Sequence, residues 1–367
     1  MKGHVRRRGD AWRIFYDLGP DPLTGRRRLR SATVHGSRDE AERRLQIILG
    51  KVAEDAMPDP QKTTVSQFAG RWLSLVEASL RPSTVDGYRQ KLDLACKTIG
   101  SRELRSLTGD GLTDLYRRIP RSAQTVMHVH RVLHRMLSDA VRWGLLARNP
   151  ADSALPPRVP KPELDTWSVA EVTRFLEQTG GDRLAGLWRL ACTTGMRRGE
   201  LCGLRWPAVD LARGLLTVVE SRVMVNGRPQ AGQPKTRAGR RRVALDPQTV
   251  RILEDHRAGQ EAERAWLGAG YQSGGWVFCW EDGHPYSPDW VSRRFVNLTD
   301  RTGLRRIRFH DLRHTYATLA LEAGVAPKVV SDRLGHAGIR ITLDTYTHHS
   351  DNLDRQAARQ VAALVDG

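Results

Sequence analysis

His310-Asp311-Leu312-Arg313-His314-Thr315, Leu334-Gly335-His336 and Tyr346 follow one another in the last third of the chain. Two histidines, an arginine and a tyrosine make a poor metal site, because arginine cannot ligate a metal and tyrosine rarely does. The same residue types suit a site that holds a phosphodiester while a phenol attacks it. Such a site still needs affinity for DNA and further positive charge, which must come from the rest of the chain.

Composition favours a polyanionic partner. The 367 residues include 59 Lys and Arg against 41 Asp and Glu, a net charge of +18; a solvated basic surface is the alternative. No run approaches the roughly 18 apolar residues of a membrane span, so no membrane partner is expected. The four cysteines are scattered without paired spacing, as expected for reduced, mostly buried thiols in a cytoplasmic protein.

Residues 1–56 predict a three-stranded sheet followed by a helix. Residues 12–17 alternate with the period of a strand, a turn leads into a second run over 26–34, and Ser37 with Glu40 forms a capping box. Arginines recur at alternate positions of these strands, so a stack of them could lie in a DNA groove. A small structural domain with a solvated face is the alternative. The candidate DNA contacts are Arg6, Arg8, Arg26, Arg28 and Arg30.

Residues 63–150 read as a helical unit after a proline-punctuated linker. The helix expected over 122–143 carries Arg131 and Arg135, two further candidate DNA contacts, and histidines at 128, 130 and 134. No cysteine or carboxylate shares that face in the sequence pattern, so a polar or DNA-facing surface is predicted rather than a metal site. Any helical bundle would fit the pattern alone.

Residues 163–367, after a second proline-rich linker, predict a mixed, mainly helical domain with a small antiparallel sheet. Strands are expected over 215–225 and 240–245, with Asn226-Gly227 as a hairpin turn, and Ser287-Pro288 is expected to cap a helix. The predicted fold class is therefore multidomain α+β, with an all-helical middle domain.

Six residues of this last domain could together cleave a phosphodiester. Two arginines can grip one phosphate bidentately and offset the charge of its transition state. A tyrosine with an ordinary pKa of about 10 needs a base or a positive field, which a histidine supplies, while a lysine or histidine protonates the leaving 5′-oxygen. A phosphotyrosine would store the bond energy, so neither ATP, metal nor another cofactor is expected. The six residues are Arg197, Lys235, His310, Arg313, His336 and Tyr346.

These residues, with Thr194-Gly195-Met196-Arg197-Arg198-Gly199-Glu200-Leu201 around the first arginine, resemble the tyrosine recombinases of the phage-integrase family. The resemblance implies that Arg197 and Arg313 clamp the phosphate and that Glu200 supports the first of them. It implies Lys235 as general acid on a β-turn, His310 and His336 as the two motif histidines, and Tyr346 as nucleophile. Arg198 is the alternative to Arg197, but the family register Gly-x-Arg prefers Arg197.

The resemblance also implies an organisation in three parts. Residues 1–56 are similar to the β3α arm-binding module of integrases from phages and integrative elements. Residues 63–150 are similar to the helical, SAM-like core-binding domain, and residues 163–367 to the catalytic domain. The expected protein is a site-specific recombinase acting through a 3′-phosphotyrosyl intermediate on double-stranded core and arm sites.

Recombination of two duplexes implies a homotetramer on DNA, formed from a free monomer, with an excisionase or a host bending protein as a possible partner. The tail over 353–365 is expected to pack on a neighbouring protomer or on its own. Two alternatives remain: a DNA-relaxing topoisomerase with the same tyrosine chemistry, and a regulator that binds DNA without cleaving it.

Overall fold

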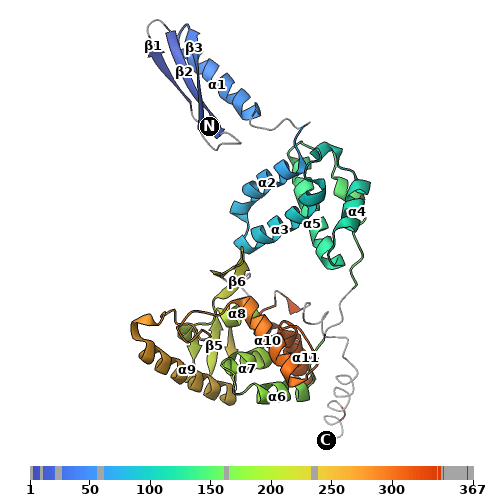
Figure 1. The fold of residues 1–367 in the computed structure, drawn as a ribbon, viewed down its shortest axis with the longest axis vertical. Coiled ribbons are helices and arrows are strands. Elements are labelled where there is room, and N and C mark those ends of the chain that lie inside the picture. The colour runs from blue at the N-terminus through green and yellow to red at the C-terminus, as the bar shows by residue number, and fades with distance from the viewer. Residues whose placement is uncertain are drawn as a thin grey trace. The chain divides into compact units, whose positions relative to one another are not determined.

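The computed structural model describes residues 3–8, 11–20, 27–55, 62–160, 165–232, 239–336, 338, 339, 342 and 362. Side chains are described at all of these except 17–20, 27–29 and 48–55. The chain divides into two compact units, Met1–Pro160 and Lys161–Gly367 (Figure 1). The predicted tripartite division stays a prediction. Several predicted site residues lie outside the described residues, namely Arg26, Lys235 and Tyr346. The same holds for the tail residues that were expected to form a docking face.

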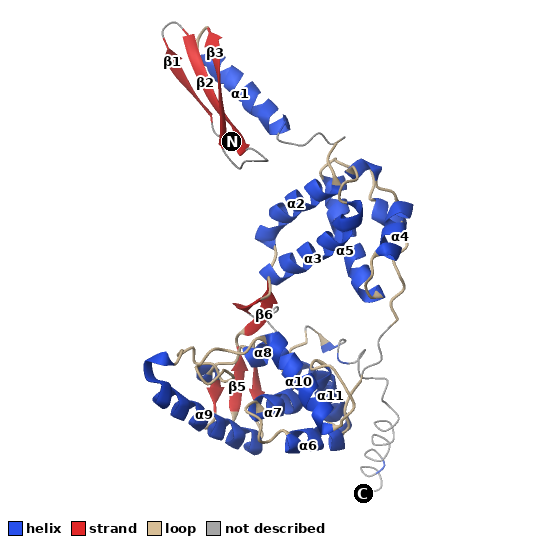
Figure 2. Cartoon of the chain, in the orientation of Figure 1, coloured by secondary structure: helices blue, strands red, loops and turns tan. Residues whose placement is uncertain are grey.

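The N-terminal sheet is an antiparallel meander with one helix on its face. Strands β1 (Gly3–Arg8), β2 (Ala11–Pro20) and β3 (Arg27–His35) pair in that order, and α1 (Arg38–Asp55) follows (Figure 2). Ile14 of β2 and Ala41 of α1 are fully buried, and Leu45 of α1 is 7% exposed. The predicted capping box is confirmed, because the Ser37 amide donates to Glu40 at 2.9 Å and the Glu40 amide donates to the Ser37 hydroxyl at 3.2 Å.

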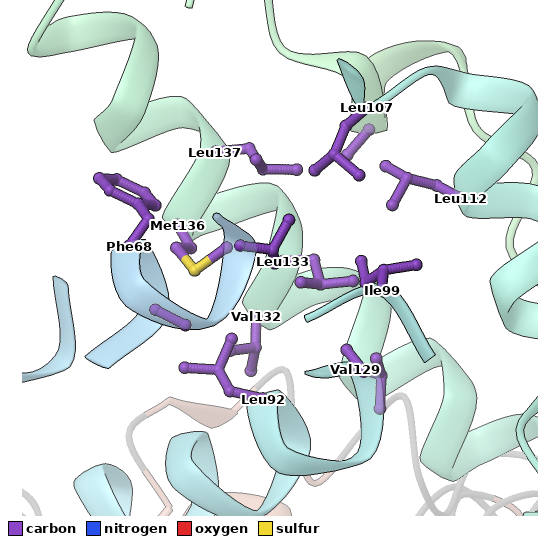
Figure 3. Packing of buried hydrophobic residues seen from close by; sticks show 14 of the residues in the cluster. Phe68, Leu92, Ile99, Leu107, Leu112, Val129, Val132, Leu133, Met136 and Leu137 are labelled. Carbon is purple, nitrogen blue, oxygen red and sulfur yellow. The ribbon is translucent and has the colours of Figure 1, made fainter. Parts of the chain in front are cut away.

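The remainder of the first unit is helical, as predicted. Thr64 and Gln67 form both bonds of a capping box that starts the first helix. One apolar cluster, which includes Phe68, Leu133 and Met136, fills the space between the helices (Figure 3). The elements are α2 (Val65–Val76), η1 (Glu77–Ser79), α3 (Pro82–Ile99), η2 (Leu104–Ser106), α4 (Gly109–Arg118), α5 (Ala123–Arg142) and η3 (Pro150–Ser153).

The second unit is mixed and mainly helical, which confirms the predicted fold class. Its helical elements are α6 (Val169–Gln178), α7 (Ala185–Thr194), α8 (Arg198–Cys202), η4 (Trp206–Ala208), α9 (Pro247–Leu267), η6 (Gly268–Gly270), α10 (Pro288–Thr302), α11 (Asp311–Glu322) and α12 (Pro327–Leu334). A three-stranded antiparallel sheet has the order β4 (Val209–Asp210), β5 (Leu215–Val218), β8 (Arg241–Ala244). Strands β6 (Ser221–Val225) and β7 (Arg228–Gly232) form a separate hairpin. Among the described helices, none combines the length and apolar character that crossing a membrane requires.

The strand region of this unit differs in part from the prediction. The single strand expected over 215–225 is two strands in two sheets, because β5 pairs with β8 and β6 pairs with β7. The hairpin turn is confirmed: Asn226 and Gly227 have φ of 49° and 72°, as a type I′ turn requires. Ser287 starts α10 but makes no side-chain capping bond; its hydroxyl instead donates to the Met224 sulfur at 3.7 Å.

Helix α9 was not anticipated, although its start is legible in the sequence. Asp246 accepts the Thr249 amide at 3.1 Å and Pro247 occupies the first helical position. Helix α7 packs against both α9 and α11. An aromatic layer holds this arrangement: the rings of Trp188, Phe295 and Phe309 contact one another at 5.5–6.1 Å. Trp188 lies on α7, Phe295 on α10 and Phe309 just before α11, so the layer packs the start of α11 against α7 and α10.

A buried polar bond ties α2 to α5 in the first unit and gives a test of its packing. The Trp72 indole N–H donates to the Asp139 carboxylate at 2.8 Å, and Trp72 is fully buried. Asp139→Ala leaves that donor unsatisfied, at a cost of about 1–3 kcal/mol. We expect amide hydrogen exchange in α2 and α5 to accelerate roughly 5- to 150-fold, measured on the whole chain by mass spectrometry. Asp114→Ala removes only an exposed ion pair with Arg117 and is the control; equal exchange in both variants would contradict a structural role for the bond.

Candidate active site

Arg197 stands at the start of α8 with one side of its guanidinium held by the protein. Its Nη1 donates to Glu200 Oε1 at 2.8 Å, its Nη2 donates to the Gly335 carbonyl at 3.1 Å, and its backbone amide donates to Glu200 Oε2 at 2.9 Å. The side chain is still 40% exposed. Arg197 is therefore fixed in direction while a broad part of it remains open to a ligand.

Arg198, the alternative clamp residue, points elsewhere. Its Nη1 donates to the Ser292 hydroxyl at 2.7 Å and pairs with Asp289 at 3.2 Å, both on α10. Of the two neighbouring arginines, only Arg197 faces the motif residues of α11 and α12.

Glu200 is a buried carboxylate shared by two arginines. Only 3% of its side chain is exposed, and besides Arg197 it accepts two bonds from Arg241, at 2.9 and 3.1 Å. Burial by itself raises the pKa of Glu200, but the hydrogen bonds and charge of Arg241, followed by those of Arg197, hold it below its ordinary value. The side chain of Arg241 is itself buried, with 7% of it exposed. Arg242 is exposed.

Arg313 lies on α11 and reaches the turn that precedes Arg197. It is 4% exposed, and its Nη1 donates to the Gly195 carbonyl at 2.9 Å. Gly195 ends α7 in the left-handed conformation, with φ of 62°. A Cβ there would lie 2.5 Å from Leu334 and 2.6 Å from Tyr316. Glycine is thus required both by the backbone angle and by the close approach of α11 and α12.

His310 and His336 lie beside the two arginines and are held neutral. The pKa of His310 is lowered to about 4. Desolvation is the largest cause, followed by the charges of His314, Arg313 and Arg197. For His336 desolvation is followed by Arg313 and Arg197, and its pKa also falls to about 4. His310 keeps part of its surface in solvent, and His336 is half-buried, with Nδ1 2.8 Å from the Thr342 hydroxyl. Both rings are therefore unprotonated imidazoles at neutral pH.

His314 joins this group although no role was predicted for it. It follows His310 by four residues, the helical spacing that places two side chains on one face. The rings meet edge to face with centroids 5.3 Å apart, and the charge of His314 contributes to the low pKa of His310. The four-residue spacing of the two histidines was the signal in the sequence that could have placed His314 in this group.

The structure thus brings together Arg197 and Glu200 of α8, His310 and Arg313 at the start of α11, and His336 after α12, which are three separate segments. Two guanidinium groups and two neutral imidazoles can bind an anionic phosphate and accept a proton beside it. Lys235 and Tyr346 complete the predicted set of six but lie outside the described residues.

The arginines of the N-terminal sheet do not form one stack. Arg6 pairs with Arg13 and Arg8 with Ala11, whereas Arg30 pairs with Tyr16. Because directly paired residues share a face and neighbours along a strand alternate, Arg30 lies on the opposite face from Arg6 and Arg8. All three are exposed. Arg26 and the side chain of Arg28 are outside the described positions.

In the helical region Arg131 and Arg135 are both exposed. Arg135 donates to the Tyr88 hydroxyl at 2.6 Å and lies over its ring. The expectation that no carboxylate faces the histidines is wrong, since His134 Nε2 is 2.8 Å from Asp152, which follows α5 in η3. Among the described residues no group of three or more His, Cys, Asp or Glu is arranged to hold a metal ion.

Residues 166–352 match the model of the phage integrase family. The chain belongs to this family. A tyrosine recombinase XerC-like protein of Caldanaerobacter subterraneus is 27% identical over 99% of this chain and 98% of its own length. The ICEBs1 integrase of Bacillus subtilis is 24% identical over 96% of this chain and 97% of its own.

Solved structures of other integrases share the fold. A fragment of the integrase of transposon Tn1549, in complex with transposon right-end DNA, matches over 82% of this chain and 100% of the fragment. Its identity is 19% and its TM-score 0.69. A lambda integrase dimer bound to a core site covers 93% of both chains at 17% identity, with a TM-score of 0.59. This integrase-family chain therefore has the fold that those proteins use.

Gly195 gives a test of how the site is assembled. Gly195→Ala forces a left-handed alanine against Leu334 and Tyr316, at a cost of roughly 2–4 kcal/mol. The melting temperature of the second unit should fall by roughly 4–16 °C in calorimetry of the whole chain. Gly259→Ala is the matched control, since that glycine lies within α9 with open space around it. A Gly195→Ala chain that melts with the wild type would show that the turn tolerates a side chain.

The histidines predict a distinct pH dependence. Because the folded-state pKa of His310 and His336 lies below the ordinary value of about 6.5, the unfolded chain takes up protons first. Stability should therefore be full above about pH 6.5 and fall as the pH drops toward 4. Imidazole C–H resonances, assigned with His310→Gln and His336→Gln, should titrate near pH 4 in the folded chain. The urea-denatured chain is the control, and folded-state midpoints near 6.5 would contradict the assignment of neutral imidazoles.

Proposed function

We propose that this integrase-family chain is a site-specific DNA recombinase that integrates or excises a phage or another mobile element. The observation that carries the proposal is the convergence of Arg197 and Arg313 with two neutral histidines around the turn at Gly195. This is the arrangement that binds a phosphodiester and assists proton transfer at it. The net charge of +18 supplies the attraction to DNA.

In the proposed reaction the Tyr346 hydroxyl attacks the scissile phosphorus. The new bond joins the tyrosine oxygen to phosphorus, the bond from phosphorus to the 5′-oxygen breaks, and a 3′-phosphotyrosyl intermediate forms. Arg197 and Arg313 would bind the non-bridging oxygens, whose charge grows in the transition state. Loss of one such preorganised donor typically lowers a rate by about 10²–10³.

Two proton transfers accompany this step. A neutral histidine, His310 or His336, accepts the tyrosine proton, and Lys235 donates a proton to the leaving 5′-oxygen. Phosphate binding would raise the pKa of both histidines, since an anion nearby favours imidazolium. Attack by the 5′-hydroxyl of a partner strand reverses the sequence and releases Tyr346. The phosphotyrosyl bond keeps the energy of the original ester, so the reaction needs neither ATP nor a metal.

The partners proposed for this chain are core-type and arm-type duplex sites, read by a catalytic domain over 163–367, a helical domain over 63–150 and the sheet domain over 1–56. On the sheet the open face carries Arg6, Arg8 and Arg13, with His4 stacked on Phe15 at 5.0 Å, and suits a DNA groove. Exchange between two duplexes would take four protomers, assembled on DNA from monomers. The names of the relatives, among them an integrase of ICEBs1, support integration as the outcome. An excisionase or a host bending protein would set its direction.

The test of this proposal is a covalent protein–DNA adduct. The 367-residue chain is incubated with a pool of nicked duplexes of random sequence and quenched in detergent, and the retained DNA is sequenced. The nick lets a short fragment diffuse away, which traps the intermediate. We expect an adduct with a defined sequence, its loss in Tyr346→Phe, and a roughly 10²- to 10³-fold slower reaction in Arg197→Ala.

Each alternative has its own outcome in this assay. Absence of an adduct with the wild-type chain would support a DNA-binding regulator. An adduct on any supercoiled plasmid, with relaxation, would support a topoisomerase. An adduct that survives Tyr346→Phe would exclude that residue as the nucleophile.

A further inference from the structure

Arg241 begins β8 yet turns its side chain inward. Its two Nη atoms donate to the two oxygens of Glu200 at 2.9 and 3.1 Å, and Nη1 also donates to the Gly239 carbonyl at 3.3 Å. Its Nε donates to the carbonyl of Arg333, near the end of α12. One planar guanidinium thus binds α8, the residues just before its own strand, and α12 at the same time.

We propose that Arg241 is a positioning residue for the phosphate clamp, which orients Arg197 through Glu200 and through the end of α12. The inference rests on the proposed function, since it concerns how that site acts on a phosphate. Arg241 is not itself proposed to touch DNA, because its side chain is 7% exposed and its donors are engaged.

Glu200, the first group that holds Arg197, depends on Arg241 to remain ionised. A carboxylate that is 97% buried is costly unless charged partners satisfy its oxygens. Arg241 contributes more than Arg197 to the low pKa of Glu200. Without Arg241, either Glu200 protonates and loosens Arg197, or Arg197 alone neutralises Glu200 and has less charge to offer a phosphate. Both outcomes weaken the clamp.

The Gly335 carbonyl, the second group that holds Arg197, is also linked to Arg241. The Gly335 carbonyl that accepts Arg197 Nη2 lies two residues after the Arg333 carbonyl that accepts Arg241 Nε. Arg333 returns to β8 by donating to the Ala244 carbonyl at 3.2 Å, and its Nε donates to the Tyr316 hydroxyl at 2.6 Å. Strand β8 and the end of α12 are therefore cross-linked at two points. Both groups that hold the Arg197 guanidinium are therefore connected to Arg241: Glu200 accepts from it directly, and Gly335 lies two residues after the carbonyl that accepts its Nε.

The test compares variants on three forms of one scissile ester, in a duplex recovered from the random pool. The first form is the ordinary phosphate. The second is a methylphosphonate, whose transition state carries less charge and depends less on the arginines. The third has sulfur at the bridging 5′ position, a leaving group that needs no proton from Lys235.

We expect Arg241→Ala to slow adduct formation on the ordinary phosphate by about 10- to 100-fold, less than the loss of a direct donor. The deficit should shrink on the methylphosphonate, as for Arg197→Ala, and persist on the bridging sulfur, which instead rescues Lys235→Ala. Arg241→Lys should fall between wild type and Arg241→Ala, since lysine keeps the charge but loses the planar fork. Adding Glu200→Gln to Arg241→Ala should cost little more, because the two act as one unit.

Arg183→Ala is the matched control. It removes another two-pronged pair of the same unit, in which Arg183 Nη2 donates to Glu263 at 2.8 Å, and any deficit should be equal on all three esters. An equal deficit for Arg241→Ala on all three esters would reduce Arg241 to a structural residue. Rescue by the bridging sulfur would show instead that Arg241 acts through Lys235. Absence of any wild-type adduct would overturn the proposed function, and this inference with it.

Discussion

The buried carboxylate of Glu200, held between Arg197 and Arg241, is the interaction on which the candidate site depends. A charge removed from water is stable only where charge-assisted hydrogen bonds replace its hydration. Glu200 therefore enforces the positions of two guanidinium groups that would otherwise repel each other. Because Arg197 needs only part of its donors for this bond, the rest of its surface stays open to a ligand.

The fold brings this carboxylate and the motif residues together through a turn that has no room for a side chain. At Gly195 the chain leaves α7 in a left-handed conformation, and Leu334 and Tyr316 close over it. The Gly195 carbonyl then accepts Arg313, which joins α11 to the same turn. Gly195 thus serves both the packing of α11 and α12 and the placement of Arg313. A change that loosens this packing would also separate Arg313 from Arg197.

Much of this could be predicted from local sequence, because capping boxes and hairpin turns are set by a few adjacent residues. Thr64 with Gln67, Ser168 with Glu171, and Asn226-Gly227 all act as their local patterns indicate. The inward turn of Arg241 could not be predicted in this way, because its partner Glu200 lies 41 residues away. The face of Arg30 depended on strand register, and the division of 215–225 depended on which strand each half would pair with. These features are determined by contacts between residues far apart in the sequence, so a short stretch of sequence does not predict them.

If the candidate site binds a DNA phosphate as proposed, its electrostatics would couple that binding to protonation of the histidines. Arg197 and Arg241 flank the carboxylate of Glu200, and Arg313 lies beside the motif histidines. The charges of Arg197 and Arg313 help to keep His310 and His336 neutral. A scissile phosphate would supply the missing anion, and only then would an imidazolium be favourable beside the arginines. In the proposed reaction, proton transfer from Tyr346 to a histidine would therefore be easier with the phosphate bound than in the free protein. Such a site would restrain its base until the substrate arrives, because the same charges that would bind the phosphate oppose protonation of the histidines in its absence.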